Sequence, residues 1–344
     1  MRWASAVVGA CIVVALGGAG CDSGVCAPVD GGTQGVAYSI AVLPDTQYYA
    51  SSWPEIFQAQ TRWLVDNRAP EQLAFVLHTG DIVDSDVPQQ WQVASQALHA
   101  LDDQVPYVIT AGNHDYLTLA DRMGMGNSYF PAADFARFPW FQGTFEVDHI
   151  ENSFSLFTVP DGRWLVIALE FGPRDEVLAW ANDILATFPD TRAIIITHAY
   201  LYRDNSRYDH VGSPGKQFNP HEYVMMGQLG STINDGEEIW TKLVAPNSNV
   251  KLVFSGHDVN GRGIPPGTAA RLTSVRADGT TVHQILANYQ TCTAPPCEAV
   301  HGGNGFLRLL HFPVGGGQVA VETYSPYLDQ SLVDADNRFT LDMN

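Results

Sequence analysis

The chain has 344 residues, and 45% of them are hydrophobic, so it can bury a sizeable core without relying on disulfides or metals. Its formal net charge is −19, with Lys and Arg numbering 18 against 37 Asp and Glu. Because binding to phosphate backbones depends on basic side chains, this charge argues against nucleic acid as a partner. The charge fits a soluble protein that works outside the cytoplasm. Because the core is large enough to fold without a metal, any bound metal would serve chemistry.

The first 20 residues are typical of a bacterial export signal. Arg2 supplies a positive start, residues 7–16 form an apolar stretch too short to span a bilayer, and small residues at 17–20 precede Cys21. Residues 22–35 are polar and rich in glycine, without periodicity. We therefore predict a signal peptide over residues 1–20 and a flexible tether over residues 21–35.

The cysteines leave two processing routes open. If Cys21 is lipidated, the protein is anchored in the cell envelope, and Cys26 stays unpaired beside a Cys292–Cys297 disulfide. If an ordinary signal peptidase cuts the chain, the protein is periplasmic or secreted, and the four cysteines can form two short bridges. Gly18 stands where lipoprotein signals usually carry leucine. A lipid anchor is the only membrane attachment that we expect.

A repeated order of strand, loop and helix begins after the tether. Strands are predicted at 37–44, 73–79, 106–111, 193–197 and 249–255, and helices at 54–68, 88–102, 175–188 and 236–245. From residue 271 the pattern turns to strands, at 282–288, 305–312 and 318–324. This alternation predicts an α/β protein with a buried sheet or pair of sheets. No linker interrupts it, so we expect a single domain over residues 36–344.

Polar residues able to bind a metal stand at the ends of these predicted strands. They are Asp45, Asp81, Asn113, His198 and His257. Because the carboxyl ends of strands converge on one crevice in open α/β sheets, we expect these side chains to meet in space. Each one alone is more typical of a turn or a capping loop. Their succession at consecutive strand ends favours a shared metal site.

The segments around these residues resemble the calcineurin-like metallophosphoesterases across residues 45–260. That family's pattern is Asp-x-His, Gly-Asp-x-x-Asp, Gly-Asn-His-Asp/Glu, a later His, and Gly-His-x-His. The matching segments here are Asp45-Thr46-Gln47, Gly80-Asp81-Ile82-Val83-Asp84, Gly112-Asn113-His114-Asp115, His198 and Gly256-His257-Asp258-Val259. The resemblance implies a double-sheet βαβ sandwich flanked by helices, in four layers. It also implies a metal-dependent phosphoric ester hydrolase that acts on small-molecule or macromolecular phosphoesters.

The same resemblance gives each matched residue a role. It implies that Asp81 bridges two divalent ions, either Mn, Fe or Zn, and that the second ion is completed by Asn113, His198 and His257. It implies that His114 protonates the leaving oxygen and that Asp115 orients the His114 ring.

Two departures from the family pattern fall on the side of the first ion. That ion keeps Asp45, but Gln47 stands where one histidine is expected and Val259 where another is. Valine cannot bind a metal, and an amide oxygen is a poorer ligand than imidazole for a transition ion. We therefore predict an asymmetric centre in which the first ion is weakly bound. The Asp-Thr-Gln form also resembles an exported bacterial subgroup of these phosphoesterases.

A polar, aromatic loop over residues 199–223 follows His198. Loops at the ligand end of such folds set specificity, and the candidate contacts to substrate are Arg203, Arg207, His210 and His221. The alternative is that pairs of Asp, Arg and Tyr simply hold this loop together. A rival function is a catalytically weakened envelope protein that binds a phosphorylated or glycan ligand. The presence of His114 favours the enzyme, because a binding protein needs no proton donor.

Overall fold

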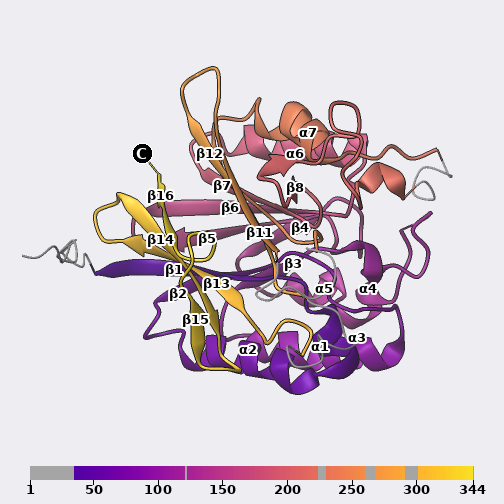
Figure 1. The fold of residues 1–344 in the computed structure, drawn as a ribbon, viewed down its shortest axis with the longest axis vertical. Helices are drawn as coiled ribbons and strands as arrows, with labels where there is room; N and C mark the ends of the chain where they lie inside the picture. Colours follow the sequence, from indigo (N-terminus) through magenta and orange to yellow (C-terminus); the bar gives the residue numbers. More distant parts are fainter. Residues whose placement is uncertain (1–34, 121, 224–229, 260–267, 291–300, 344) are drawn as a thin grey trace, which may run out of the picture. The chain divides into compact units, whose positions relative to one another are not determined.

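The computed structural model describes residues 35–120, 122–223, 230–259, 268–290 and 301–343 (Figure 1). The predicted signal peptide, the tether before residue 35, and the cysteines Cys21, Cys292 and Cys297 lie outside these ranges, so their lipidation and pairing stay predictions. None of the helices in these ranges combines the length and apolarity needed to cross a bilayer.

The first large sheet joins the two ends of the described chain. Its strands run in the order β15-β14-β13-β1-β2-β3, and β16 pairs with β14. Their bounds are β1 Val36–Leu43, β2 Leu73–His78, β3 Tyr107–Ile109, β13 Leu307–Pro313, β14 Gln318–Ser325, β15 Gln330–Leu332 and β16 Phe339–Asp342. Strands β1, β2 and β3 are parallel, whereas β13 runs antiparallel to β1.

The second large sheet is built from the middle of the chain, in the order β11-β12-β10-β7-β6-β5-β4. Its strands are β4 Phe141–Thr144, β5 Ser153–Val159, β6 Gly162–Leu169, β7 Arg192–Thr197, β10 Val250–Ser255, β11 Thr268–Val275 and β12 Thr281–Asn288. Strands β6, β7, β10 and β12 are parallel. A short hairpin of β8 (Leu201–Tyr202) and β9 (Ser206–Arg207) lies in the loop after β7.

Helices cover the outer face of each sheet, which gives four layers (Figure 1). Helices α1 (Gln47–Ser52), α2 (Pro54–Asp66) and α3 (Pro88–Leu98) cover the first sheet, and α6 (Asp175–Thr187) and α7 (Gly236–Ile239) cover the second. The shorter turns and helices are η1 His99–Leu101, η2 Asn113–Asp115, α4 Gly126–Tyr129, α5 Ala132–Phe135, η3 Pro220–Glu222 and η5 Trp240–Val244. The predicted α/β sandwich is confirmed.

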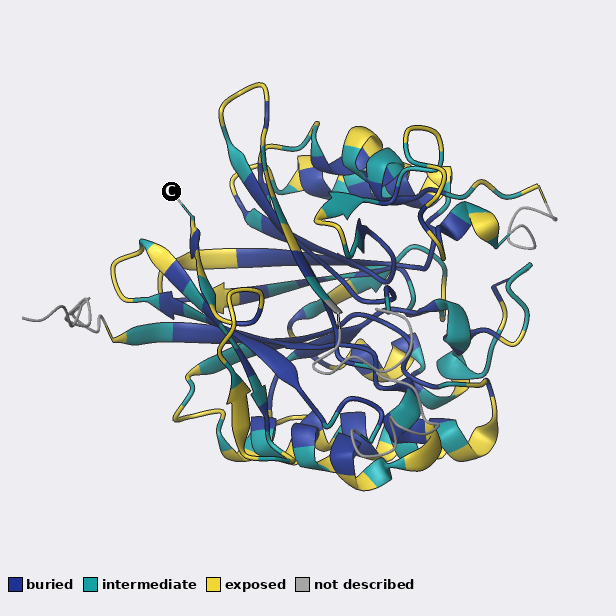
Figure 2. Cartoon of the chain, in the orientation of Figure 1, coloured by how far each residue is buried: buried dark blue, intermediate teal, exposed yellow. Residues whose placement is uncertain are grey.

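The main core lies between the two sheets, whose strands are largely buried (Figure 2). Phe75 of β2 stacks on Phe157 of β5 with ring centroids 4.5 Å apart. Trp164 of β6 donates its indole hydrogen to the Tyr38 hydroxyl of β1 at 3.0 Å. Along β6, alternate side chains enter this core or the second core beneath α6, so the strand is apolar on both faces.

The boundaries of several elements differ from the sequence predictions. The helix predicted over residues 88–102 ends at Leu98 and is followed by the 3₁₀-helix η1. The helix predicted over residues 236–245 is the short α-helix α7 followed by the π-helix η5. Residues 47–52 form α1. This helix has little helix-forming sequence, but Tyr49 and Ala50 are buried, so packing rather than propensity holds it.

Candidate metal centre

The five strand-end residues converge where the two sheets meet at their carboxyl ends. Asp45 follows β1, Asp81 follows β2 and Asn113 follows β3, whereas His198 follows β7 and His257 follows β10. Ligand atoms of Asp81, His198 and His257 lie within 4.8 Å of one another, and all three residues are buried. The His257 amide donates to Asp45 Oδ2 at 3.1 Å, which ties the second sheet to the first.

His198 directs one ring nitrogen at a carboxylate. Its Nδ1 donates to the Thr79 carbonyl at 2.8 Å, so Nε2 is left without a proton in the neutral ring. Nε2 lies 3.2 Å from Asp81 Oδ2 and makes no hydrogen bond. Burial lowers the pKa of His198, but Asp81 and Asp45 outweigh it and raise the value to about 9. The position therefore favours a positive charge, and a carbonyl that fixes the opposite nitrogen is typical of a metal-binding histidine.

His257 is fixed in a similar way. Its Nε2 donates to the Phe218 carbonyl at 2.8 Å, which leaves Nδ1 as the nitrogen able to bind a metal. Burial lowers the pKa of His257 to about 3, so the ring is neutral, as metal binding requires. Its backbone has a φ of +70°. Non-glycine residues rarely adopt this conformation, and its occurrence at a ligand position is consistent with strain stored at a functional site.

Asp81 lies at the centre of the site. It also has a left-handed backbone, with φ +49°, and its Oδ1 accepts the His114 amide at 3.0 Å. Burial raises its pKa, but the adjacent His198 and His114 rings outweigh this and lower the pKa of Asp81 overall. A Cβ at Gly112 would overlap Asp81 Oδ1, so the glycine before Asn113 allows the two strand ends to approach.

Asp45 is held by two donors from the second sheet. Besides the His257 amide, Asn288 at the end of β12 donates from Nδ2 to Asp45 Oδ2 at 2.7 Å. Burial raises the pKa of Asp45 to about 8, and the neighbouring Asp81 carboxylate contributes to this rise. A Cβ at Gly256 would overlap Asp45 Oδ1. A cation beside Asp45 would relieve the cost of burying two carboxylates together.

Three buried atoms in this region have no hydrogen-bond partner: Gln47 Oε1, Asn113 Oδ1 and His198 Nε2. The Gln47 amide is oriented because its Nε2 donates to Asp84 Oδ1 at 3.2 Å, which leaves its oxygen free. Buried polar atoms are normally satisfied, so orphans that gather beside two carboxylates call for an ion. Oxygen and imidazole ligands suit Mn, Fe or Zn. The residues present therefore fit the divalent ions that the sequence predicts.

The predicted proton donor lies beside these ligands, but its partner differs from our expectation. His114 is 39% exposed at its side chain, and its Nδ1 contacts the Asp84 carbonyl at 2.8 Å. The Asp81 carboxylate raises the pKa of His114. Asp115 does not orient this ring, which corrects that assignment. Asp115 instead accepts the backbone amides of Ile82 and Val83, at 2.8 and 3.0 Å, and of Gly112 at 2.8 Å.

The candidate substrate residues of the 199–223 loop are all bound to other side chains. Arg203 pairs with the fully buried Asp258, with 2.7 Å between Nη2 and Oδ1. Arg207 Nε lies 2.6 Å from Glu237 Oε2, and its guanidinium stacks on Trp240. His210 contacts Asp235 and His221 contacts Glu238. These acidic partners lie outside the loop, so the contacts fasten the loop to neighbouring segments, and a phosphate contact by any of these residues stays a prediction.

We expect Arg203→Met to destabilise the fold by about 3 kcal/mol, because it leaves the buried Asp258 carboxylate without its partner. Burial raises the pKa of Asp258 to about 6, so at pH 7 most of this group carries its charge. Urea unfolding at pH 7 measures the effect. Arg137→Met is the control, because Arg137 and Asp102 form a pair in which the arginine is 54% exposed, and its loss should cost at most about 1 kcal/mol. Equal losses for both variants would contradict the expectation.

Asn288 is a site residue that the sequence did not single out, and Asp84, the last residue of the Gly-Asp-x-x-Asp segment, received no role from it. Asn288 obeys the same rule as the others, because it ends a parallel strand next to β10. It could have been found by applying that rule to the predicted strand 282–288. The role of Asp84 depends on its backbone carbonyl and on its contact with Gln47, neither of which leaves a sequence signal.

The fold is similar to a purple acid phosphatase from yellow lupin (Lupinus luteus), at 14% identity and a TM-score of 0.48, covering 89% of this chain and 53% of that one. It is also similar to a 5′-nucleotidase precursor from Thermus thermophilus, at 13% identity and a TM-score of 0.46, covering 89% and 54%.

In sequence, the chain is 32% identical over 313 residues to the uncharacterized protein YvnB of Bacillus subtilis. The match covers 87% of this chain but spans only 21% of that relative's length. The family model described as calcineurin-like phosphoesterase matches residues 38–261, which contain every predicted metal ligand. The chain therefore belongs to the calcineurin-like phosphoesterase family.

Proposed function

We propose that this protein is a metal-dependent phosphoric ester hydrolase that acts on phosphomonoesters or phosphodiesters. The observation that carries the proposal is the arrangement around Asp81. There, two imidazoles and two carboxylates meet at the strand ends, and His198 Nε2 points at the Asp81 carboxylate. The family match supports the same reaction class.

The proposed chemistry divides between the ions and the side chains. Divalent ions at this site would neutralise the charge of a phosphoester and activate the attacking water. Asp81 would hold both ions, while Asn113, His198 and His257 complete one of them. His114 is fixed through Nδ1 by the Asp84 carbonyl, so its Nε2 can give a proton to the departing oxygen. Its partly exposed ring, beside the buried ligands, places this proton at the solvent side of the centre.

We propose that the two ions are held with unequal strength. Support comes from the compact group of Asp81, His198 and His257, to which Asn113 adds an unpartnered oxygen. On the other side, the two histidines of the family pattern are replaced by Gln47, which offers only an amide oxygen, and by Val259, which offers no ligand atom. The neighbouring Asp258 carboxylate does not fill the place of the missing histidine, because it is paired with Arg203.

The expected result is that dialysis removes one of the two ions that depend on Asp81. The measurement is metal content after dialysis, taken as the difference between the wild type and Asp81→Asn. This difference should be about one ion per chain, because the Asp45 side lacks the two histidines. A difference of two ions would show that the asymmetry is wrong.

The function itself is tested with chromogenic substrates. Purified full-length protein is assayed with Mn²⁺ on a phosphodiester and a phosphomonoester, with His198→Ala as the inactive control. Hydrolysis that is lost in the control supports the proposal, and the faster substrate gives the ester class. If the wild type hydrolyses neither ester, the rival proposal of an envelope protein that binds a phosphorylated or glycan ligand is favoured.

We also propose that the protein is exported, and is either lipid-anchored through Cys21 or free in the periplasm or medium. The support is the sequence of residues 1–21 alone. The mass of the amino-terminal peptide from the mature protein tests it. A lipid-modified Cys21 indicates the anchored form, and an unmodified, shortened amino terminus indicates the free form. An intact Met1 would contradict export.

A further inference from the structure

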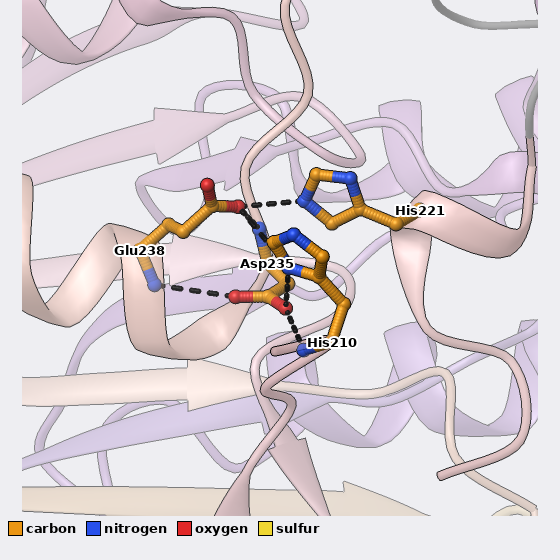
Figure 3. A group of neighbouring side chains, drawn as sticks. All are labelled: His210, His221, Asp235 and Glu238. Atoms are coloured by element: carbon orange, nitrogen blue, oxygen red, sulfur yellow. Dashed lines mark hydrogen bonds and ion pairs between the residues drawn. The ribbon is translucent and has the colours of Figure 1, made fainter. Parts of the chain in front are cut away.

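A second group of side chains that could bind a metal lies between the loop after β7 and the start of α7, apart from the Asp81 centre. It consists of His210, His221, Asp235 and Glu238, whose ligand atoms all lie within 4.8 Å of one another (Figure 3). Asp235 is fully buried, and the other three are partly buried. None of the four is a predicted ligand of the phosphoesterase centre, although His210 and His221 are candidate substrate contacts, so the group needs its own explanation.

The distances within the group bracket those of a four-ligand metal site. His221 Nε2 lies 2.6 Å from Glu238 Oε2, and His210 Nδ1 lies 3.0 Å from Asp235 Oδ2 and 3.9 Å from Glu238 Oε2. Zn²⁺ binds nitrogen and oxygen at about 2.0–2.2 Å in a tetrahedron, which separates its ligand atoms by about 3.4 Å. The observed separations lie on both sides of this value. Shifts of less than about 1 Å would therefore bring all four atoms around one ion.

The rings of the two histidines stack on each other. Their rings stack with centroids 3.6 Å apart and an angle of 26° between planes, so both rings turn toward the same pair of carboxylates (Figure 3). Each histidine directs one ring nitrogen at a carboxylate oxygen. An ion would take the place of the hydrogens between these two nitrogens and the carboxylates, and each neutral ring would carry its proton on the other nitrogen.

The backbone already fixes the two acidic residues. Asp235 caps α7 by accepting the Glu238 amide at Oδ1, and Glu238 accepts the Asp235 amide at 3.0 Å. Asp235 Oδ2 also accepts from Asn219 Nδ2 at 3.0 Å. One pair of ligands therefore stands on a rigid turn, and an ion would attach the loop through His210 and His221. Sites with four protein ligands and no open position are structural in character.

The attached loop bears directly on the Asp81 centre. His221 belongs to η3, and the preceding Asn219 reaches Asp235. Its neighbour Phe218 supplies the carbonyl that accepts from His257 Nε2. An ion in the second group would therefore fix the segment that orients a predicted ligand of the first. The two sites share no ligand, so either one can be tested without the other.

We propose that His210, His221, Asp235 and Glu238 bind one structural Zn²⁺ or a similar divalent transition ion, which fastens the loop at residues 209–223 onto α7. Nitrogen and oxygen ligands in a tetrahedral arrangement suit Zn²⁺ better than Ca²⁺ or Mg²⁺, which prefer six or more oxygens. This site does not depend on the proposed hydrolase activity.

The test compares the metal content of full-length variants after dialysis. The double variant His210→Ala/His221→Ala should hold about one ion fewer per chain than the wild type, because it loses both imidazole ligands. The variant Asp81→Asn should keep that ion. His149→Ala is the matched control, because His149 is 40% exposed and contacts only groups outside both sites, and it should leave the content unchanged. Equal metal content in the double variant and the wild type would overturn the proposal and leave a hydrogen-bonded cluster.

A second measurement covers the case in which the double variant folds poorly. Zn²⁺ is added to the folded Asp81→Asn protein and to Asp81→Asn/Glu238→Gln, which keeps the shape of the side chain but weakens the ligand. The melting temperature should rise with Zn²⁺ in the first protein and rise less in the second, because an ion that binds only the folded state stabilises it. Co²⁺ in place of Zn²⁺ should give the visible absorption of a tetrahedral ion in Asp81→Asn. Equal rises in melting temperature, together with no such absorption, would show that Zn²⁺ binds elsewhere.

Discussion

Asp81→Asn is expected to abolish hydrolysis and to release the ions of the phosphoesterase centre. Asp81 is 3% exposed, and its carboxylate lies 3.2 Å from His198 Nε2. Asparagine keeps the size but removes the charge that both ions need. Charge stabilisation by such ions contributes several kcal/mol to the transition state, so kcat/KM should fall on the order of 1,000-fold or more. Steady-state assays and metal analysis measure the two effects.

The control for Asp81→Asn is Asp86→Asn. Asp86 is also buried, but its Oδ1 accepts from the Trp91 indole at 2.6 Å and from the Met125 amide at 2.8 Å, outside the predicted centre. An asparagine can keep both of these contacts through its amide oxygen. The Asp86 variant should therefore retain its metal and its activity. If Asp81→Asn also retains both, the assigned role of Asp81 is wrong.

His114→Ala is expected to lower kcat by about 100- to 10,000-fold while the metal content stays the same. The reason is that the ring lies beside the ligands without being one of them, and only its backbone amide contacts Asp81. The loss should be smallest for a substrate with a good leaving group, such as a nitrophenolate, because that oxygen needs no proton. The measurement is kcat for substrates of graded leaving-group pKa, with His149→Ala as the control. A uniform loss across the series would argue against proton donation.

Asp115→Asn should separate catalysis from support of the site. Its carboxylate accepts three backbone amides that hold the segments 82–83 and 112 together. In the asparagine variant, the side-chain NH2 group faces one of these backbone N–H groups, so two donors oppose each other. The variant should therefore lose stability as well as activity. His114→Ala, in contrast, should unfold at the same temperature as the wild type. We expect these different stabilities because Asp115 accepts backbone amides and does not orient the His114 ring.

The general form of the site could be predicted because strand ends leave a clear sequence signal. A run of apolar residues that stops at Asp45, Asp81 or His198 indicates both a strand and the edge at which its last residue lies. Glycines before Asp81, Asn113 and His257 mark the close approach of these segments. The order of strands within each sheet has no comparable signal. For example, β13 lies beside β1 although about 270 residues separate them.

The roles within the loop at residues 199–223 could not be predicted, for a physical reason. A histidine or arginine has the same sequence signature whether it faces a substrate, an acidic partner or an ion. Only the path of the backbone decides this, and here it brings His210 and His221 against the turn at Asp235, which begins 25 residues after His210.

By itself, the sequence indicated an α/β protein in one folded unit and the residue types of the candidate metal centre, because burial periodicity and strand ends are local properties, while the double-sheet sandwich was implied by the family resemblance. Only the tertiary structure decided that Asn288 holds Asp45, that the Asp84 carbonyl orients His114, and that Arg203 is committed to Asp258. These contacts join segments that are 30 to 243 residues apart in the chain. Such pairings depend on how the two sheets and their loops pack against each other, and no local pattern encodes that packing.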